Sequence, residues 1–141
     1  MKIVRLQKYS REVFEALRRL DTQLSERPST ITPAQVRRLL AAKQSEVFAL
    51  KDGAVICGMG TIAYAEMLDG RTAHIDDVVV DEAYRGQGLG ALLMQQLIER
   101  ARKRQVIFIE LTSRPSRIAA NKLYQKIGFA LRETNVYRLK F

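Results

Sequence analysis

Three glycines, Gly86, Gly88 and Gly90, lie within five residues between an apolar, strand-like run and a long helical pattern. Glycine has no Cβ, so successive backbone N–H groups can converge on one point without obstruction. The helix that begins here adds its unpaired N–H groups and the positive end of its dipole. The segment therefore predicts a strand–loop–helix unit that binds an anion, most naturally a phosphate or pyrophosphate. An ordinary flexible turn, the alternative, rarely needs three alternating glycines.

Two known phosphate-binding patterns fit this loop poorly. A P-loop needs a lysine and then a serine or threonine after its last glycine, whereas Ala91 occupies that place here. The dinucleotide-binding pattern is matched by Gly86, Gly88 and Ala91, and Glu110 supplies an acidic residue about 20 positions further on. However, residues 111–141 are too few to complete the doubly wound sheet of that class of protein.

The remaining apolar patterns predict a single α/β domain over residues 1–141, with a mixed (α+β) sheet. Apolar runs and alternations predict strands, and apolar residues at helical spacing predict helices. Strands are expected over residues 3–6, 46–50, 54–65, 73–80, 106–111, 129–133 and 136–141, and helices over 13–24, from 32 onward, from the glycine loop to about 104, and over 116–127. This order, β-α-α-β-β-β-α-β-α-β-β, is typical of a sheet with helices packed against it.

The chain carries 24 Lys and Arg against 15 Asp and Glu, a net charge of +9. Such an excess is typical of nucleic-acid-binding proteins. Here it is spread evenly along the chain, and no aromatic–basic motif accompanies it. The densest group, residues 100–104, ends a predicted helix, where cations suit the helix dipole. We therefore expect no nucleic-acid partner, although an anionic small ligand would benefit from the same charge.

A single cysteine, Cys57, excludes an internal disulfide and any multi-cysteine metal site, and its apolar neighbours indicate a buried side chain. The longest uncharged run, residues 54–65, is too short to span a membrane. The N-terminal residues have charges every few positions and no apolar core of a signal peptide. We expect a cytoplasmic protein with no membrane contact and no metal.

Two separate motifs resemble those of the GNAT N-acetyltransferase superfamily. Arg85-Gly86-Gln87-Gly88-Leu89-Gly90 resembles its acetyl-CoA loop, Arg/Gln-x-x-Gly-x-Gly/Ala. The stretch from Asn121 through Tyr124 to Gly128-Phe129 resembles its late helix, Asn-x-x-Tyr-x-x-x-Gly-Phe, and residues 74–81 look like its fourth strand. The resemblance covers residues 74–129 closely and the rest of the chain loosely. It implies the GNAT-like acyl-CoA N-acyltransferase fold.

The resemblance implies acetyl-CoA as the cosubstrate and a place for each of its parts. The pyrophosphate would contact the loop residues Arg85, Gly86, Gln87, Gly88, Leu89, Gly90 and Ala91. The amides of the pantetheine arm would pair, like an added strand, with the backbone edge of Val78, Val79 and Val80, and with Asn121. In the family this strand splays from the next, here residues 106–111, and opens a wedge. A backbone N–H near Val78 or Val79 would face the thioester oxygen.

Acyl transfer to an amine needs a neutral nucleophile, and an alkylamine with a pKa of about 10.4 arrives protonated at pH 7. A carboxylate, directly or through water, is expected to take that proton. The candidates are Asp76 and Asp77, which in a regular strand point to opposite faces unless a bulge re-aims them. Glu110, on the opposite wall of the wedge, is the third. The alternative for each is a solvated or salt-bridged acid, and the only histidine, His74, is expected at the surface.

The departing thiolate of CoA resembles a cysteine thiolate, with a pKa of about 8.5 for its thiol. A phenol within reach can hydrogen-bond it or protonate it. Tyr124 occupies the position where the family places such a tyrosine; the alternative is a half-buried packing residue.

The sequence thus predicts an N-acetyltransferase that moves an acetyl group from acetyl-CoA to a primary amine by direct attack in a ternary complex. A non-catalytic acetyl-CoA-binding sensor or partner domain, and a basic nucleic-acid-binding module, are the alternatives. The acceptor, a small molecule or a protein amine, is not specified by the sequence. The net positive charge favours an anionic or neutral acceptor over a polyamine, and a homodimer is compatible with the resemblance because many relatives dimerise.

Overall fold

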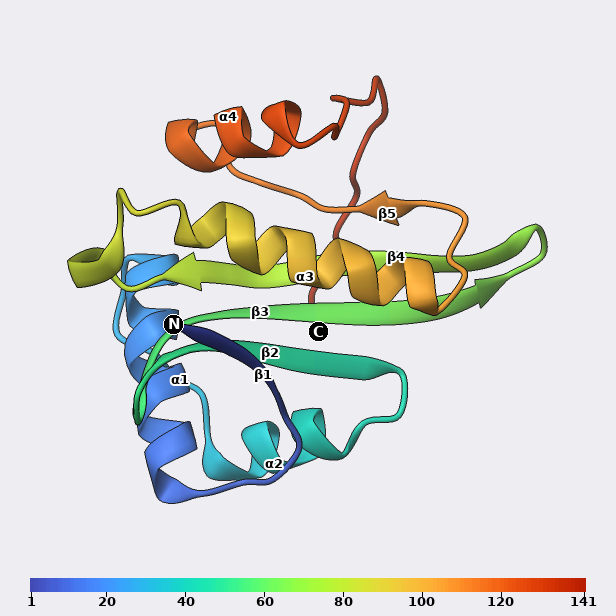
Figure 1. Ribbon diagram of the computed structural model, residues 1–141. Helices are drawn as coiled ribbons and strands as arrows, with labels where there is room; N and C mark the ends of the chain where they lie inside the picture. The colour runs from blue at the N-terminus through green and yellow to red at the C-terminus, as the bar shows by residue number, and fades with distance from the viewer.

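The computed structural model describes residues 1–141 as a five-stranded sheet with helices on both faces (Figure 1). The strands are β1 (Lys2–Leu6), β2 (Ser45–Asp52), β3 (Val55–Met67), β4 (Gly70–Val80) and β5 (Ile109–Glu110). The helices are α1 (Arg11–Ser25), α2 (Pro33–Ala41), the short 3-10 helix η1 (Glu82–Tyr84), α3 (Leu89–Lys103) and α4 (Ile118–Lys126). The predicted fold class, a mixed α/β sheet, is confirmed.

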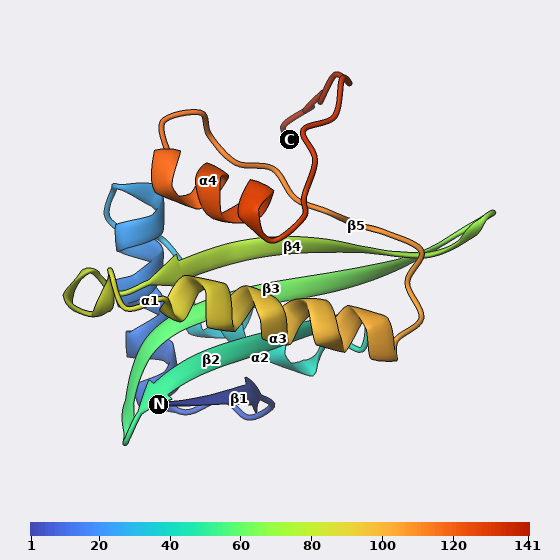
Figure 2. The ribbon, with the colours of Figure 1, turned by 45° about the horizontal axis from the view of Figure 1, so that its top comes forward.

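The strands follow one another across the sheet in the order β1-β2-β3-β4-β5. The first four pair antiparallel, and β5 runs parallel to β4. Helix α3 covers one face of the sheet, whereas α1 and α2 cover the other (Figure 2). Side chains of β2 alternate between the two layers: Phe48 packs with Leu93 of α3, and its neighbour Ala49 packs with Leu17 of α1.

Local signals in the sequence place several of these elements. Helix α2 begins with a complete capping box, in which the Thr32 hydroxyl accepts from Gln35 N at 3.3 Å and Gln35 Oε1 accepts from Thr32 N at 2.8 Å. The β2–β3 hairpin turns at Gly53, whose φ of 56° lies in the left-handed region. These short-range features agree with the helix expected from residue 32 onward and with the strands expected over residues 46–50 and 54–65.

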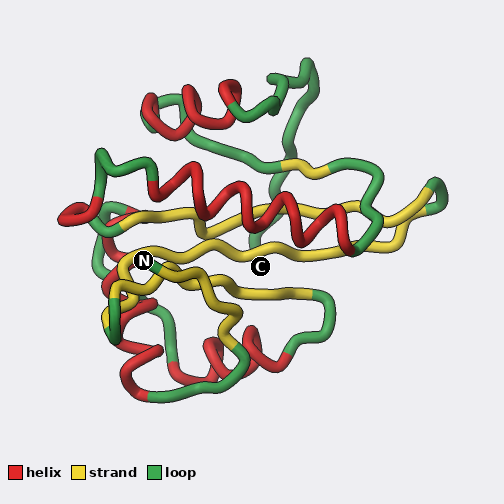
Figure 3. The backbone as a smooth tube through the Cα atoms, in the orientation of Figure 1, coloured by secondary structure: helices red, strands yellow, loops and turns green.

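The C-terminal end of the chain differs from the prediction. The strands expected over residues 129–133 and 136–141 are absent, and residues 130–141 make no backbone–backbone hydrogen bond (Figure 3). The expected strand over residues 106–111 is reduced to β5. The apolar pattern that predicted these strands is present, but a strand also needs a paired edge, and none lies alongside. Consequently several large apolar side chains are exposed: Leu131, Val136, Tyr137, Leu139 and Phe141.

Candidate active site

The open edge of β4 is the central feature of the site. β5 pairs with β4 only at Ala73–Ile109 and His74–Glu110, near the beginning of β4. The chain then leaves β4 towards α4, so the second half of β4 has β3 on one side and no strand on the other (Figure 2). This opening lies where the sequence predicted a wedge between this strand and the next.

A β-bulge lies in β4 at the paired aspartates. Met59 of β3 is opposite Val79, but Thr61 is opposite Asp76, so β4 carries one residue more than β3 over this interval. Asp77 takes the extra place with a φ of 55°, in the left-handed region that a non-glycine residue rarely adopts. The bulge therefore re-aims the carboxylates, and the opposite-face rule for neighbouring strand residues does not apply.

The three candidate bases have different surroundings. Although Asp77 is an exposed residue, desolvation by the surrounding protein raises its pKa; a hydrogen bond with Thr61 lowers it, and the nearby charges of Asp76 and Asp21 raise it again. Since Asp21 belongs to α1, Asp77 faces the α1 side of the sheet. Asp76 lies 3.6 Å from Nε2 of the partly exposed His74. Glu110 accepts a hydrogen bond at 2.7 Å from Arg132, so its carboxylate already has a cationic partner.

The glycine loop has the shape of an anion cradle. Gly86 and Gly88 have φ values of 78° and 75°, which favour glycine, and a Cβ on either would meet no atom within 4 Å. Gly88 is the N-cap residue of α3 and provides no side-chain hydrogen bond to it. The N–H groups of the first turn of α3, from Leu89 on, therefore remain available to a ligand. A phosphate fits these donors and this open space.

Helix α1 supports the segment that leads into the cradle, a contact that no local sequence pattern predicted. Arg19 forms an ion pair with the buried Asp81 and donates a hydrogen bond to Ile56 O at 2.7 Å. Asp81 in turn caps η1 by accepting from Ala83 N at 3.1 Å. Gln23 accepts from the preceding N–H, that of Glu82, at 2.9 Å. These residues are far apart in the sequence and meet only through the packing of α1.

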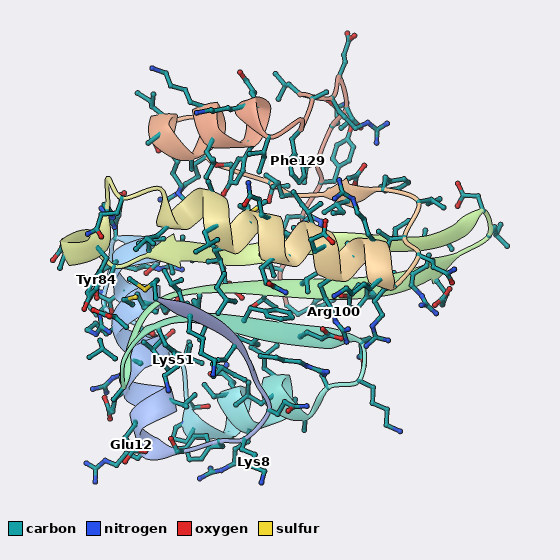
Figure 4. The ribbon with its side chains drawn as sticks, viewed as in Figure 1. Lys8, Glu12, Lys51, Tyr84, Arg100 and Phe129 are labelled. Atoms are coloured by element: carbon teal, nitrogen blue, oxygen red, sulfur yellow. The ribbon has the colours of Figure 1, made fainter.

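Tyr124 lies on the inner side of α4 and is only 6% exposed. Its ring packs edge-on against that of Phe129, at 6.2 Å between centroids. Phe129 lies where the chain leaves α4 (Figure 4). Burial raises the pKa of Tyr124, whereas the charge of Arg117 and a hydrogen bond with it lower that pKa. Asn121, one turn earlier, donates to Arg114 O at 3.0 Å and thus holds the loop before α4.

Two arginines cap the open edge of β4. Arg117 Nη2 donates to Val78 O at 3.0 Å, and Arg85 Nε donates to Val80 O at 3.1 Å. The sequence predicted Arg85 as a ligand of the pyrophosphate, a role that stays a prediction, and it predicted no role for Arg117. Its only signal in the sequence is its place just before the late helix, and nothing local shows that it reaches β4.

A cavity of about 1070 Å³ lies between β5, α4 and the C-terminal segment. Its lining includes Tyr124, Asn121, Glu110 and His74, which the fold thus brings together. The glycine loop and Asp77 lie outside this lining. The structure holds no group of three or more His, Cys, Asp or Glu side chains suited to a metal ion, and no helix with the length and apolar character of a membrane span. The cytoplasmic location stays a prediction.

Comparison with known proteins defines the class. Residues 11–129 match the model of the acetyltransferase (GNAT) family, so the chain belongs to this family. It is 40% identical over 67 residues to glucosamine 6-phosphate N-acetyltransferase 1 of Oryza sativa subsp. japonica, a match that covers 48% of this chain but only 38% of that enzyme. It is 28% identical over 110 residues to the N-alpha-acetyltransferase RimI of Mycobacterium tuberculosis, covering 78% of this chain and 68% of the relative.

Solved structures agree on the fold. The structure of an aminoglycoside acetyltransferase from an uncultured soil metagenomic sample superposes with a TM-score of 0.86. The alignment covers 99% of this chain and 95% of the other, at 22% sequence identity. At that identity the likeness establishes the shared fold, and the substrate of the present chain has to be inferred from its own residues.

Proposed function

We propose that the protein transfers an acetyl group from acetyl-CoA to a primary amine by direct attack in a ternary complex. The observation that carries the proposal is the open edge of β4 next to the glycine cradle, with Tyr124 linked to that edge through Arg117. The pyrophosphate would bind the N–H groups of residues 86–91, and the peptide-like amides of the pantetheine arm would pair with Val78 and Val80 as an added strand does. Acetyl-CoA enters the reaction as a substrate and supplies the thioester.

Asp77 is the base that we favour among the three acids. A carboxylate whose pKa is raised is a better proton acceptor than an ordinary one. Glu110 is held by Arg132, and Asp76 lies beside His74. In the proposal Asp77 takes the ammonium proton, directly or through water, and the free amine attacks the thioester carbon.

Tyr124 is proposed to assist the leaving group. Tyr124 belongs to the lining of the cavity between β5, α4 and the C-terminal segment, and burial raises the pKa of its phenol, which keeps it protonated at neutral pH. A phenol O–H that hydrogen-bonds the sulfur stabilises negative charge that develops only as the C–S bond breaks.

The charges near the bulge bear on the class of acceptor. Two further carboxylates lie near Asp77, since the charges of Asp76 and Asp21 both raise its pKa, whereas the excess positive charge is spread over the whole chain. Since short-range charge outweighs distant, screened charge, this side of the site favours a cationic amine. The local field thus argues against the anionic or neutral acceptor that the net charge favoured.

The test is a screen of amines with acetyl-CoA. The panel contains glucosamine 6-phosphate, a peptide with a free N-terminus and an aminoglycoside, after the names of the relatives, together with a diamine. Free thiol release gives the rate, and mass spectrometry identifies the acetylated product. Acetyl-CoA binding without turnover of any amine would favour the non-catalytic alternative. The absence of binding would overturn the proposal.

A further inference from the structure

The hydrogen bonds of Arg85 and Arg117 lie on the same edge of β4. Carbonyl groups two residues apart in a strand point to the same side, so those of Val78 and Val80 both face away from β3. Buried or half-buried backbone groups need a partner, and here each carbonyl obtains one from a guanidinium rather than from a neighbouring strand. The edge that is open to a ligand is thus capped by two exchangeable side chains.

A ligand that pairs with this edge must displace both caps. This step rests on the proposed function, since the amide N–H groups of a pantetheine arm would donate to the same carbonyls. The Arg85 side chain is then freed beside the cradle, where the ligand supplies a pyrophosphate. Arg117 is freed at the other end of the opening, beside Tyr124. The negative charge that a thioester ligand develops at that end is on its sulfur.

We propose that Arg117 is a catalytic residue that stabilises the departing thiolate together with Tyr124. In the reaction the amine lone pair forms the C–N bond, and the electron pair of the C–S bond moves to sulfur. The ammonium proton goes to Asp77 before the attack, and the second proton that nitrogen loses as the amide forms passes, directly or through water, to the departing sulfur. Until that proton arrives, the sulfur receives hydrogen bonds from the Tyr124 hydroxyl and the Arg117 guanidinium. Arg117 gives up no proton, because a guanidinium stays charged in this pH range. Its contribution is positive charge placed where negative charge appears.

The backbone around Arg117 is held firmly enough for this role. Its own N–H donates to Arg114 O at 3.0 Å, and the side-chain amide of Asn121 donates to the same oxygen at 3.0 Å. Arg114 Nη2 reaches across to Leu24 O at the end of α1, at 2.9 Å. The loop before α4 is therefore attached to α1, and only the long Arg117 side chain has to shift when its bond to Val78 is replaced. The nearby Arg117 charge also lowers the pKa of Tyr124, which makes its phenol a stronger donor.

The test separates binding from chemistry with two matched variants. Arg85→Ala should weaken acetyl-CoA affinity, whereas Arg117→Ala should leave it unchanged or tighten it, because a competitor for Val78 O is removed. Calorimetry measures both. The single-turnover rate of thiol release should fall by about 10- to 100-fold in Arg117→Ala, the value of one charged hydrogen bond. Arg117→Lys should recover part of this rate, and added guanidinium should partly rescue Arg117→Ala. Lys122→Ala, which removes an exposed charge from α4, serves as the control.

The rate is measured with an amine and also with water as the acceptor. The C–S bond breaks in both reactions, so the experiment does not depend on knowing the natural amine. If the wild-type protein releases thiol and Arg117→Ala releases it equally fast, the inference is wrong and the transferase proposal stands. The inference is also wrong if Arg117→Ala loses affinity and keeps its rate at saturation. If the wild-type protein releases no thiol with any acceptor, the proposed function itself fails and this role fails with it.

Discussion

Replacing Glu46 with glutamine is expected to destabilise the protein strongly and in a pH-dependent way. The Glu46 side chain is fully buried in β2 beneath the end of α3. Its carboxylate accepts hydrogen bonds from Arg100 at 2.5 and 2.8 Å and from Arg104 at 2.6 Å, and Arg5 lies 3.8 Å away. Figure 4 shows Arg100 at this end of α3. The cluster fixes the C-terminal end of the helix whose N-terminal end forms the cradle.

The size of the effect follows from the pKa of Glu46. Burial raises this pKa, but the hydrogen bonds from Arg100 and Arg104 and the charges of Arg100 and Arg5 outweigh burial and lower it from 4.5 to about 2. At about 1.4 kcal/mol per pKa unit, the ionised carboxylate contributes about 3 kcal/mol to the free energy of unfolding. Because the folded pKa lies below the unfolded value, this contribution is complete above pH 4.5 and is lost as the pH falls towards 2.

Urea denaturation at a series of pH values tests this reasoning. At pH 7 Glu46→Gln should lose about 3 to 5 kcal/mol, since the arginines are left without their buried counter-ion. The gap between wild type and variant should narrow as the pH falls from 5 to 3. Glu99→Gln, which removes an exposed partner of Arg102 on the same helix, should change stability by less than about 1 kcal/mol at any pH. A Glu46→Gln gap of similar size at pH 7 and pH 3 would refute the argument.

Four further changes test the site and the chain end. Gly88→Asp, which places a Cβ and a negative charge in the cradle, should reduce acetyl-CoA affinity in calorimetry by at least about tenfold while the protein stays folded by circular dichroism. Tyr124→Phe should keep affinity and lower the single-turnover rate by at least about tenfold; an unchanged rate would make Tyr124 a packing residue. Asp77→Asn should slow transfer by about 10²–10⁴-fold. It should also remove the fall in activity on acidification that a raised carboxylate pKa causes, and survival of that limb would point to Glu110. Removing residues 130–141, which make no backbone–backbone hydrogen bonds and expose large apolar side chains, should leave the thermal midpoint nearly unchanged and reduce self-association in light scattering.

Much of the fold could be predicted because its signals are local. The capping box at Thr32, the hairpin glycine Gly53 and the alternating glycines before α3 each determine the conformation of a few adjacent residues. The element order from β1 to α4 follows from such signals together with the spacing of apolar residues. The C-terminal segment is the exception. Its apolar alternation is real, but whether it forms a strand depends on an edge elsewhere in the molecule.

The contacts that build the site join residues far apart in the sequence. Arg19 meets Asp81, Arg117 meets Val78, and Glu46 meets Arg100. Each pair depends on how elements pack, and long side chains such as arginine reach neighbours that no spacing rule anticipates. The sequence therefore allowed the glycine cradle and Tyr124 to be predicted as candidate site residues. It did not predict the long-range contacts that hold these residues in place and put charge beside them.

The bulge at Asp77 explains why a correctly predicted strand β4 did not predict which of its backbone groups and side chains face the site. Before it, Arg71 O and Ala73 N face the β5 side of β4, so odd-numbered residues present their backbone groups there. After the bulge, Val78 O and Val80 O face the open side of β4, so there the even-numbered residues present their backbone groups to this edge. The side chains change faces as well: Ile75 packs with the core beneath α3 and Val79 with the core beneath α1, although four residues apart they would share a face in a regular strand.

One extra residue thus decides which carbonyls face the open edge of β4. The left-handed conformation of Asp77 costs about 1 to 3 kcal/mol, which the surrounding pairs of β3 and β4 must offset. Aspartate is among the residues that tolerate this conformation best. Asp77 has both the strained backbone and the carboxylate with the raised pKa, so backbone geometry and proton transfer would be coupled at this residue. The period-two pattern of a strand in the sequence does not indicate the bulge.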